Sequence, residues 1–185
     1  MPKSRRKARE AALKALYRLD IGGASPDSVI ADMREHEQLE PDLIDYAEKL
    51  VRGVFERRQD LDSRLTSIIT GYDYERVAPV DKNVMRIASY ELYHEPSIAP
   101  AISIDEAIEI ARKYSTEESG AFVNGILDRM RKQSPKANWD PATAPPEHTE
   151  ESAPREQIEV LPTEEVGPDE AKKLARFGWK LRTDE

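Results

Sequence analysis

The sequence predicts an all-α fold of about seven helices, followed by a largely disordered C-terminal tail. Apolar residues recur at three- and four-residue spacing through residues 4–130, and helix-starting and helix-ending residues separate these stretches. No stretch alternates as a strand would. After Gln133 the chain becomes rich in Pro, Glu, Ala and Thr, so it buries too little apolar surface to offset its ordering entropy. We therefore expect one helical domain over 1–133 and a tail over 134–185, in which 168–182 allows a short helix.

The first four helices are predicted from apolar stripes with defined ends. In the first, Ala and Leu residues form the inward stripe, and the basic residues, Arg9 among them, lie largely off it. A Gly-Gly pair ends this helix. Ser25 followed by Pro26 is typical of the start of the second helix, and Pro41 opens the third. The expected ranges are 4–20, 25–36, 41–58 and 58–71.

The last three helices carry start and stop signals of their own. A proline opens the fifth helix, and a Glu-Pro pair ends it, which gives an expected range of 79–95. Ser103 and Glu106 fit a capping box that would start the sixth helix, because the hydroxyl and the carboxylate each accept a free N–H. Ser115 and Glu118 fit a second box, which would start the seventh.

Composition narrows the class of protein. The chain of 185 residues has no cysteine, which excludes disulfides and fits a reducing compartment. No apolar run approaches the roughly 20 residues that span a bilayer, so we expect a cytoplasmic protein with no membrane partner. The net charge is −8, yet the first 18 residues hold seven Lys or Arg against one Glu. The acidic average therefore does not exclude a polyanionic partner.

An enzyme is not expected. The three histidines lie far apart and match no metal-ligand spacing, and the sequence has neither a P-loop nor a dinucleotide-binding glycine pattern. Carboxylates are plentiful, but no pair of them lies in an apolar setting that would raise the pKa of one member, as acid–base catalysis by two carboxylates requires. We expect no catalytic residue, no metal and no cofactor.

The first functional signal is the basic run near the N-terminus. Its cations are Arg5, Arg6, Lys7 and Arg9, at the start of an amphipathic helix where Tyr17 could share the exposed side. Positive charge at a helix N-terminus opposes the macrodipole, so a ligand such as phosphate explains it better than folding does. The alternative is a solvated helix start, which is what a bare basic run usually is.

Two further signals leave their alternatives open. Glu118 and Phe122 are four residues apart and share a helical face, so the ring could stack on an unpaired base while the carboxylate accepts from an amino group. Phe122 could equally be core and Glu118 a cap. Asp81, Asn83, Arg86 and Glu91 are polar residues on a mostly apolar helix; surface charge with an occasional salt bridge is the favoured interpretation.

Three segments together resemble the NusB family of transcription antitermination factors. They are RRKAREAALKALYRLD, DKNVMRIASYELY and SIDEAIEIARKYSTEESGAFVNGILD, within residues 3–132. The resemblance implies two packed three-helix bundles, without catalysis. It also implies binding to the single-stranded boxA element of nascent ribosomal RNA with NusE, a small-subunit ribosomal protein, and assembly with RNA polymerase, NusA and NusG. Asp105 stands where many relatives have Asn, and the tail from Ser134 is outside the family pattern.

The resemblance also implies roles for particular residues. NusE would lie near Arg76 and Asp81. The alternative is a helical protein–protein adaptor that binds no RNA. The residues implied to contact RNA are Arg5, Arg6, Lys7, Arg9, Tyr17, Arg86, Glu118 and Phe122.

Overall fold

The computed structural model describes residues 5–144, and these form seven α-helices, one short 3-10 helix and no strand. The all-α prediction is confirmed. The predicted tail from residue 145 on, with its short helix over 168–182, lies outside the described residues. None of the helices in 5–144 has the length and apolarity needed to cross a membrane. The elements are α1 (Arg6–Gly22), α2 (Pro26–His36), α3 (Pro41–Glu56), α4 (Arg58–Ile68), η1 (Tyr74–Arg76), α5 (Pro79–His94), α6 (Pro100–Tyr114) and α7 (Glu117–Gln133).

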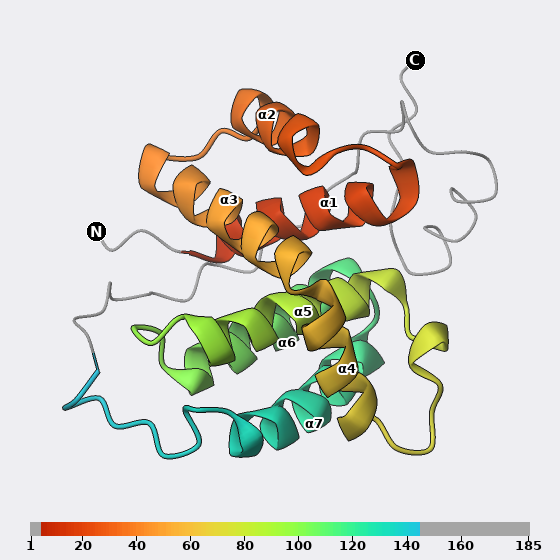
Figure 1. Cartoon of the computed structure of the whole chain (residues 1–185), viewed down its shortest axis with the longest axis vertical. Helices are drawn as coiled ribbons and strands as arrows, with labels where there is room; N and C mark the ends of the chain where they lie inside the picture. The colour runs from red at the N-terminus through yellow and green to blue at the C-terminus, as the bar shows by residue number, and fades with distance from the viewer. Residues whose placement is uncertain (1–4, 145–185) are drawn as a thin grey trace.

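The helices form two groups, and α5 of the second group packs against the first (Figure 1). Helices α1, α2 and α3 pack on one another on one side, and α5, α6 and α7 pack on the other, with α4 against α5 and α7. Helix α5 contacts α1, α3, α4, α6 and α7, so nearly every face of it is covered. The two three-helix groups match the architecture that the resemblance implied.

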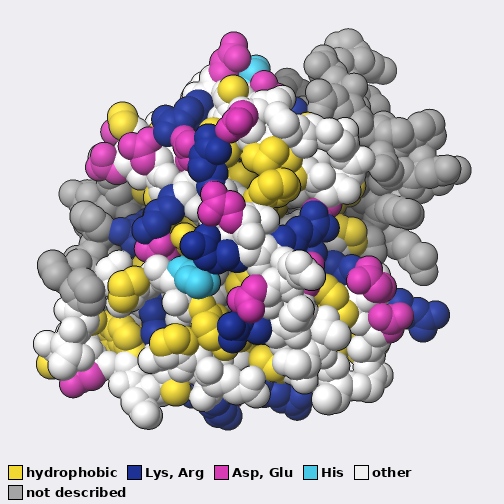
Figure 2. Space-filling view, in the orientation of Figure 1, with side chains coloured by type: hydrophobic (Ala, Val, Ile, Leu, Met, Phe, Trp, Pro, Cys, Tyr) yellow, Lys and Arg dark blue, Asp and Glu magenta, His cyan; other side chains and the backbone are white. Residues whose placement is uncertain are grey.

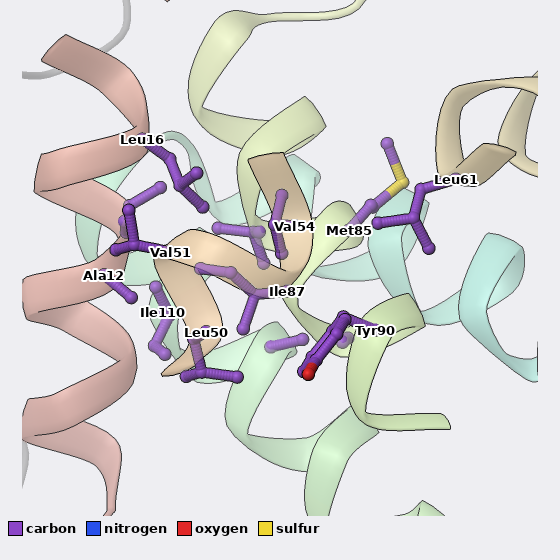
Figure 3. Packing of buried hydrophobic residues seen from close by; sticks show 14 of the residues in the cluster. Ala12, Leu16, Leu50, Val51, Val54, Leu61, Met85, Ile87, Tyr90 and Ile110 are labelled. Atoms are coloured by element: carbon purple, nitrogen blue, oxygen red, sulfur yellow. The ribbon is translucent and has the colours of Figure 1, made fainter. Parts of the chain in front are cut away.

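A continuous apolar core joins the two groups. Ala12 and Leu16 of α1 lie beside Val51 of α3, and Ile87 of α5 extends this cluster toward the second group (Figure 3). Helix α1 is flanked by α2 and α3 on one side and by α5 on another. Its small alanines allow this close approach, and charged residues on its second covered side must find partners inside the protein.

One glycine fixes the distance between α3 and α5. A Cβ added to Gly53 would lie 2.3 Å from two ring carbons of Tyr90. Carbon atoms in contact normally stay about 3.5–4.0 Å apart, so no larger residue fits here without moving the ring. The two helices can therefore pack at this depth only because residue 53 has no side chain.

Most predicted helix starts are confirmed, but both capping boxes are wrong. Ser25 Oγ accepts the Ser28 N–H at 3.2 Å, as expected for an N-cap. Helix α6 begins three residues before Ser103, at Pro100, so Ser103 is interior and buried. Thr116, not Ser115, caps α7; its hydroxyl accepts the N–H of the third residue of that helix at 3.1 Å. Helix α6 starts at Pro100 because proline is well suited to the first position of a helix.

The chain stays ordered beyond the predicted domain end at residue 133. Lys136 is buried, and its ammonium donates to the carbonyls of Glu95 and Ile98, with a distance of 2.6 Å to the second. Trp139 Nε1 donates to the Pro96 carbonyl at 3.4 Å. The C-terminal end of a helix carries partial negative charge, so a cation beside the end of α5 is favourable. Lys136 and Trp139, which the prediction assigned to the tail, therefore contact the α5–α6 connection.

Candidate nucleic-acid interface

The N-terminal basic run divides into buried and outward-facing cations. Arg6 donates from Nε and Nη2 to the carboxylate of Glu106, at 2.7 and 2.8 Å. Arg9 is only 1% exposed and donates from Nε to Glu91 Oε1 at 2.7 Å. The prediction that Arg9 lies off the inward stripe is wrong, because α1 is covered on two sides and α5 and α6 supply carboxylates to its second side.

Glu91 is the centre of this buried network. It is fully buried, and besides Arg9 it accepts the Tyr46 hydroxyl at 2.5 Å. Burial raises the pKa of the Glu91 carboxyl. The charge and hydrogen bond of Arg9 and the hydrogen bond of Tyr46 lower this pKa by more than burial raises it, so the pKa lies below its ordinary value. The carboxylate is thus held ionised inside the protein.

Arg5 and Lys7 are the two less buried cations of the run. Lys7 is exposed, and Arg5 is half-buried, with its guanidinium carbon 4.7 Å from the centroid of the Tyr46 ring. A guanidinium over an aromatic face is attracted by the ring, which holds the Arg5 side chain in place. Of the four predicted N-terminal cations, these two are the ones that the fold presents to the outside.

Two other predicted RNA contacts are built into the fold. Tyr17 is 4% exposed, so the expectation that it shares the exposed side of α1 is wrong. Arg86 is 3% exposed; it donates from Nε and Nη2 to Asp62 at 2.7 and 2.8 Å and from Nη1 to Asp20 at 3.1 Å. Arg86 thereby joins α5 to α4 and to the end of α1. The interpretation of this polar set as surface charge is also wrong, because Asn83 is buried beside it.

The two residues predicted near the partner surface differ in exposure. Arg76 is exposed at the end of η1, whereas Asp81 is 6% exposed and accepts the Ser119 hydroxyl at 2.9 Å. Burial raises the pKa of the Asp81 carboxyl above its ordinary value, and hydrogen bonds from Ser119 and Ser115 offset only part of this. Asp81 therefore holds the start of α7 against α5.

An aromatic pair lies next to the start of α7. Glu118 is exposed and Phe122 is half-buried, so the structure brings together the two residues predicted to read a base. Tyr72, which lies between the predicted fourth and fifth helices and had no role expected from the sequence, has its ring centroid 6.3 Å from that of Phe122, and the ring planes meet at 62°. Tyr72 is 54% exposed. The sequence feature that could have singled out Tyr72 is an aromatic residue directly after a glycine, Gly71, in a short connection between helices.

Charge elsewhere is mixed. Figure 2 shows Lys and Arg side chains interspersed with Asp and Glu over the face that it displays. On α2 and α3, for example, Arg34 pairs with Asp45 and Glu48, and Arg52 pairs with Glu48 and Asp27. Within residues 5–144, no cluster of His, Asp and Glu could hold a metal ion. On that face, binding to a polyanion would thus depend on individual cationic side chains rather than on an extended region of positive electrostatic potential.

Comparison with known proteins identifies the family. The family model described as the NusB family matches residues 6–132. The chain belongs to the NusB family. The transcription antitermination protein NusB of Symbiobacterium thermophilum is 40% identical over 132 residues, which cover 67% of this chain and 86% of that protein. NusB of Sorangium cellulosum is 38% identical over 137 residues, covering 74% and 98%.

Solved structures of NusB proteins have the same fold. T. maritima NusB matches with a TM-score of 0.65 and 36% identity over 72% of this chain and 94% of that one. A structure described as antitermination factors NusB and NusE in complex with dsRNA matches with a TM-score of 0.66 and 28% identity, over 72% and 99%. Because the family consists of transcription antitermination factors, the expectation that this chain is not an enzyme is confirmed.

Proposed function

We propose that this NusB-family protein binds the single-stranded boxA element of nascent ribosomal transcripts together with NusE. The complex then joins RNA polymerase with NusA and NusG and suppresses termination, which gives the protein a cytoplasmic location. The observation that carries the proposal is the similarity to a NusB solved with NusE and dsRNA, which supports RNA and NusE as partners. Outward-facing cations near α1's start and a partly exposed aromatic pair beside α7 supply the chemistry that unpaired RNA requires.

The predicted RNA residues divide into two roles under this proposal. Arg5 and Lys7 contact phosphates, while Phe122 stacks on a base and Glu118 accepts from a base amino group. The others act from inside the fold: their ion pairs and packing hold α1 and α5 in place, so that the contact groups are pre-positioned. These supporting residues are Arg6, Arg9, Tyr17 and Arg86.

NusE would contact the surface that includes η1. Arg76 is exposed there and can reach a partner directly, whereas Asp81 acts through Ser119 by fixing the start of α7. The alternative function, a helical adaptor that binds protein but no RNA, would use the same surface. The two functions differ in whether the purified protein binds boxA-type RNA.

The test is a binding titration of the full chain with a labelled single-stranded boxA-type RNA, with and without NusE, over a range of salt concentrations. The Arg5→Ala/Lys7→Ala variant should bind more weakly. The slope of log K against log salt should fall by about 0.7 for each phosphate that the variant no longer binds. Arg34→Ala, on α2, is the matched control and should leave the slope unchanged.

Three results bear on the proposal. Tighter RNA binding in the presence of NusE supports a single assembled complex, because coupling between two ligands is reciprocal. No RNA binding at physiological salt, with or without NusE, would favour the adaptor. Equal slopes for the wild type and Arg5→Ala/Lys7→Ala would remove the phosphate contacts from α1.

A further inference from the structure

Two large hydrophobic side chains are exposed among residues 5–144, Phe55 at 43% and Tyr72 at 54%. They differ in their surroundings. Phe55 lies near the end of α3, beside a shallow groove lined by α4 and η1 residues. Tyr72 lies against a second ring, that of Phe122, on the side of the molecule where Glu118 is exposed. The Tyr72 environment therefore combines two aromatic surfaces with an acceptor.

The short connection between α4 and η1 fixes the position of Tyr72. Gly71 adopts a φ of 77°, a left-handed conformation that residues with a side chain rarely take. On the other side, Asp73 Oδ1 accepts the Glu75 N–H at 3.0 Å, and the buried Tyr74 donates its hydroxyl to Asp62 at 2.6 Å. Tyr72 is thus presented by a connection that is tied down on both sides, which lowers the entropy cost of binding.

The two rings form a corner. With planes at 62° and centroids 6.3 Å apart, the edge of one ring meets the face of the other. A flat molecule can stack on an exposed ring face while its edge meets the second ring. Glu118, one helical turn before Phe122 on the same face of α7, offers a carboxylate toward such a molecule.

We propose that Tyr72 is a further RNA-contacting residue, which with Phe122 forms a corner that takes one unpaired base of the bound strand. This inference rests on the proposed function and deepens it. The occupant is a base rather than a protein side chain because planar stacking, a nearby acceptor and a pre-positioned exposed ring are together what single-strand recognition uses. A tyrosine whose role was packing would be buried, as Tyr74 is two residues later.

The experiment measures binding of the full chain to boxA-type RNAs that carry the fluorescent base 2-aminopurine at successive positions. Stacking quenches this base, so one position should show quenching with the wild type and lose it with Tyr72→Ala. Tyr72→Ala should bind RNA roughly 5- to 150-fold more weakly, as expected when the protein stacks on one base fewer. Tyr72→Phe should stay close to the wild type. Tyr72→Leu, which is apolar but not planar, should be weaker than Tyr72→Phe.

Phe55→Ala is the matched control, because it removes a comparably exposed ring elsewhere and should leave RNA affinity unchanged. Thermal melts verify that each variant is folded. If the wild type binds RNA and Tyr72→Ala binds equally well, the inference fails and the proposed function stands. If Tyr72→Ala weakens binding to NusE alone and not to RNA, Tyr72 belongs to a protein interface and the inference is wrong. If the wild type binds no RNA, both fail.

Discussion

Replacing Glu91 by glutamine tests whether the buried ion pair with Arg9 supports the fold. The substitution keeps the shape of the side chain and removes its charge. Arg9 then stays buried with Glu106 as a more distant carboxylate, 4.0 Å from Nη1. In either orientation, the NH2 group of the new amide also replaces an oxygen that accepts an N–H of Arg9.

The expected loss is large. Removing one partner of a buried ion pair costs about 3–5 kcal/mol, because the remaining charge is no longer compensated. Whole domains are stable by only about 5–15 kcal/mol, so the variant should lose a large part of its stability. For a urea m-value of roughly 2 kcal/mol/M, the unfolding midpoint should fall by about 1.5–2.5 M.

The assay is urea unfolding followed by far-UV circular dichroism, at pH 7 and at lower pH. Glu48→Gln is the control, since Glu48 pairs with arginines on the surface and should cost about 1 kcal/mol or less. The pKa of Glu91 is lowered in the native state, so the unfolded chain binds the proton more readily. The stabilisation is therefore complete above the unfolded pKa of about 4.3, and it is lost as pH falls through the lower native pKa.

The wild type should accordingly lose more stability than Glu91→Gln as pH falls below about 4.3. A Glu91→Gln midpoint within experimental error of the wild type at pH 7 would refute the reasoning, and so would equal acid sensitivity of the two proteins. Either result would mean that the charge of Glu91 does not stabilise Arg9 in the folded protein.

Two further predictions concern packing and charge. Gly53→Ala should destabilise the protein by about 1–3 kcal/mol or more, because its Cβ would overlap the Tyr90 ring. Gly125→Ala is the control: it lies at an exposed α7 position with open space around it, and it should stabilise the protein by roughly 0.5–1 kcal/mol. Equal effects of the two substitutions in urea unfolding would contradict the packing argument. Asp81→Asn should raise the unfolding midpoint at pH 7, since a raised native pKa means that the ionised carboxyl opposes folding, and the gain should shrink as pH falls and the wild-type carboxyl is protonated. A lower midpoint for Asp81→Asn at pH 7 would show that the charge itself is needed.

The sequence was informative about local structure. Apolar spacing and prolines predicted seven helices, and Ser25, Pro41 and Pro79 lie at or next to their starts. These signals act within a few residues, where side-chain geometry and backbone hydrogen bonds are decided. Where two local signals competed, as at Pro100 and Ser103, the helix starts at the proline.

The candidate site was less predictable because its polar residues find partners far along the chain. Arg6 and Glu106 are 100 positions apart, and Arg9 and Glu91 are 82 apart, so helical periodicity assigned such charges to the outside. One local signal was present: the many alanines of α1 suit a helix packed on more than one side. Tyr72 was missed because its partner ring comes from another helix, 50 positions later in the sequence.

Lys136 contacts the α5–α6 connection but lies outside the region that matches the family model. The family match ends at residue 132, but the ammonium that neutralises the end of α5 comes four residues later. A protein shortened to the matched region would lose the Lys136 hydrogen bonds to the Glu95 and Ile98 carbonyls, and the Trp139 contact as well. Contacts that stabilise the α5–α6 connection therefore come from residues outside the region that this chain shares with the family model.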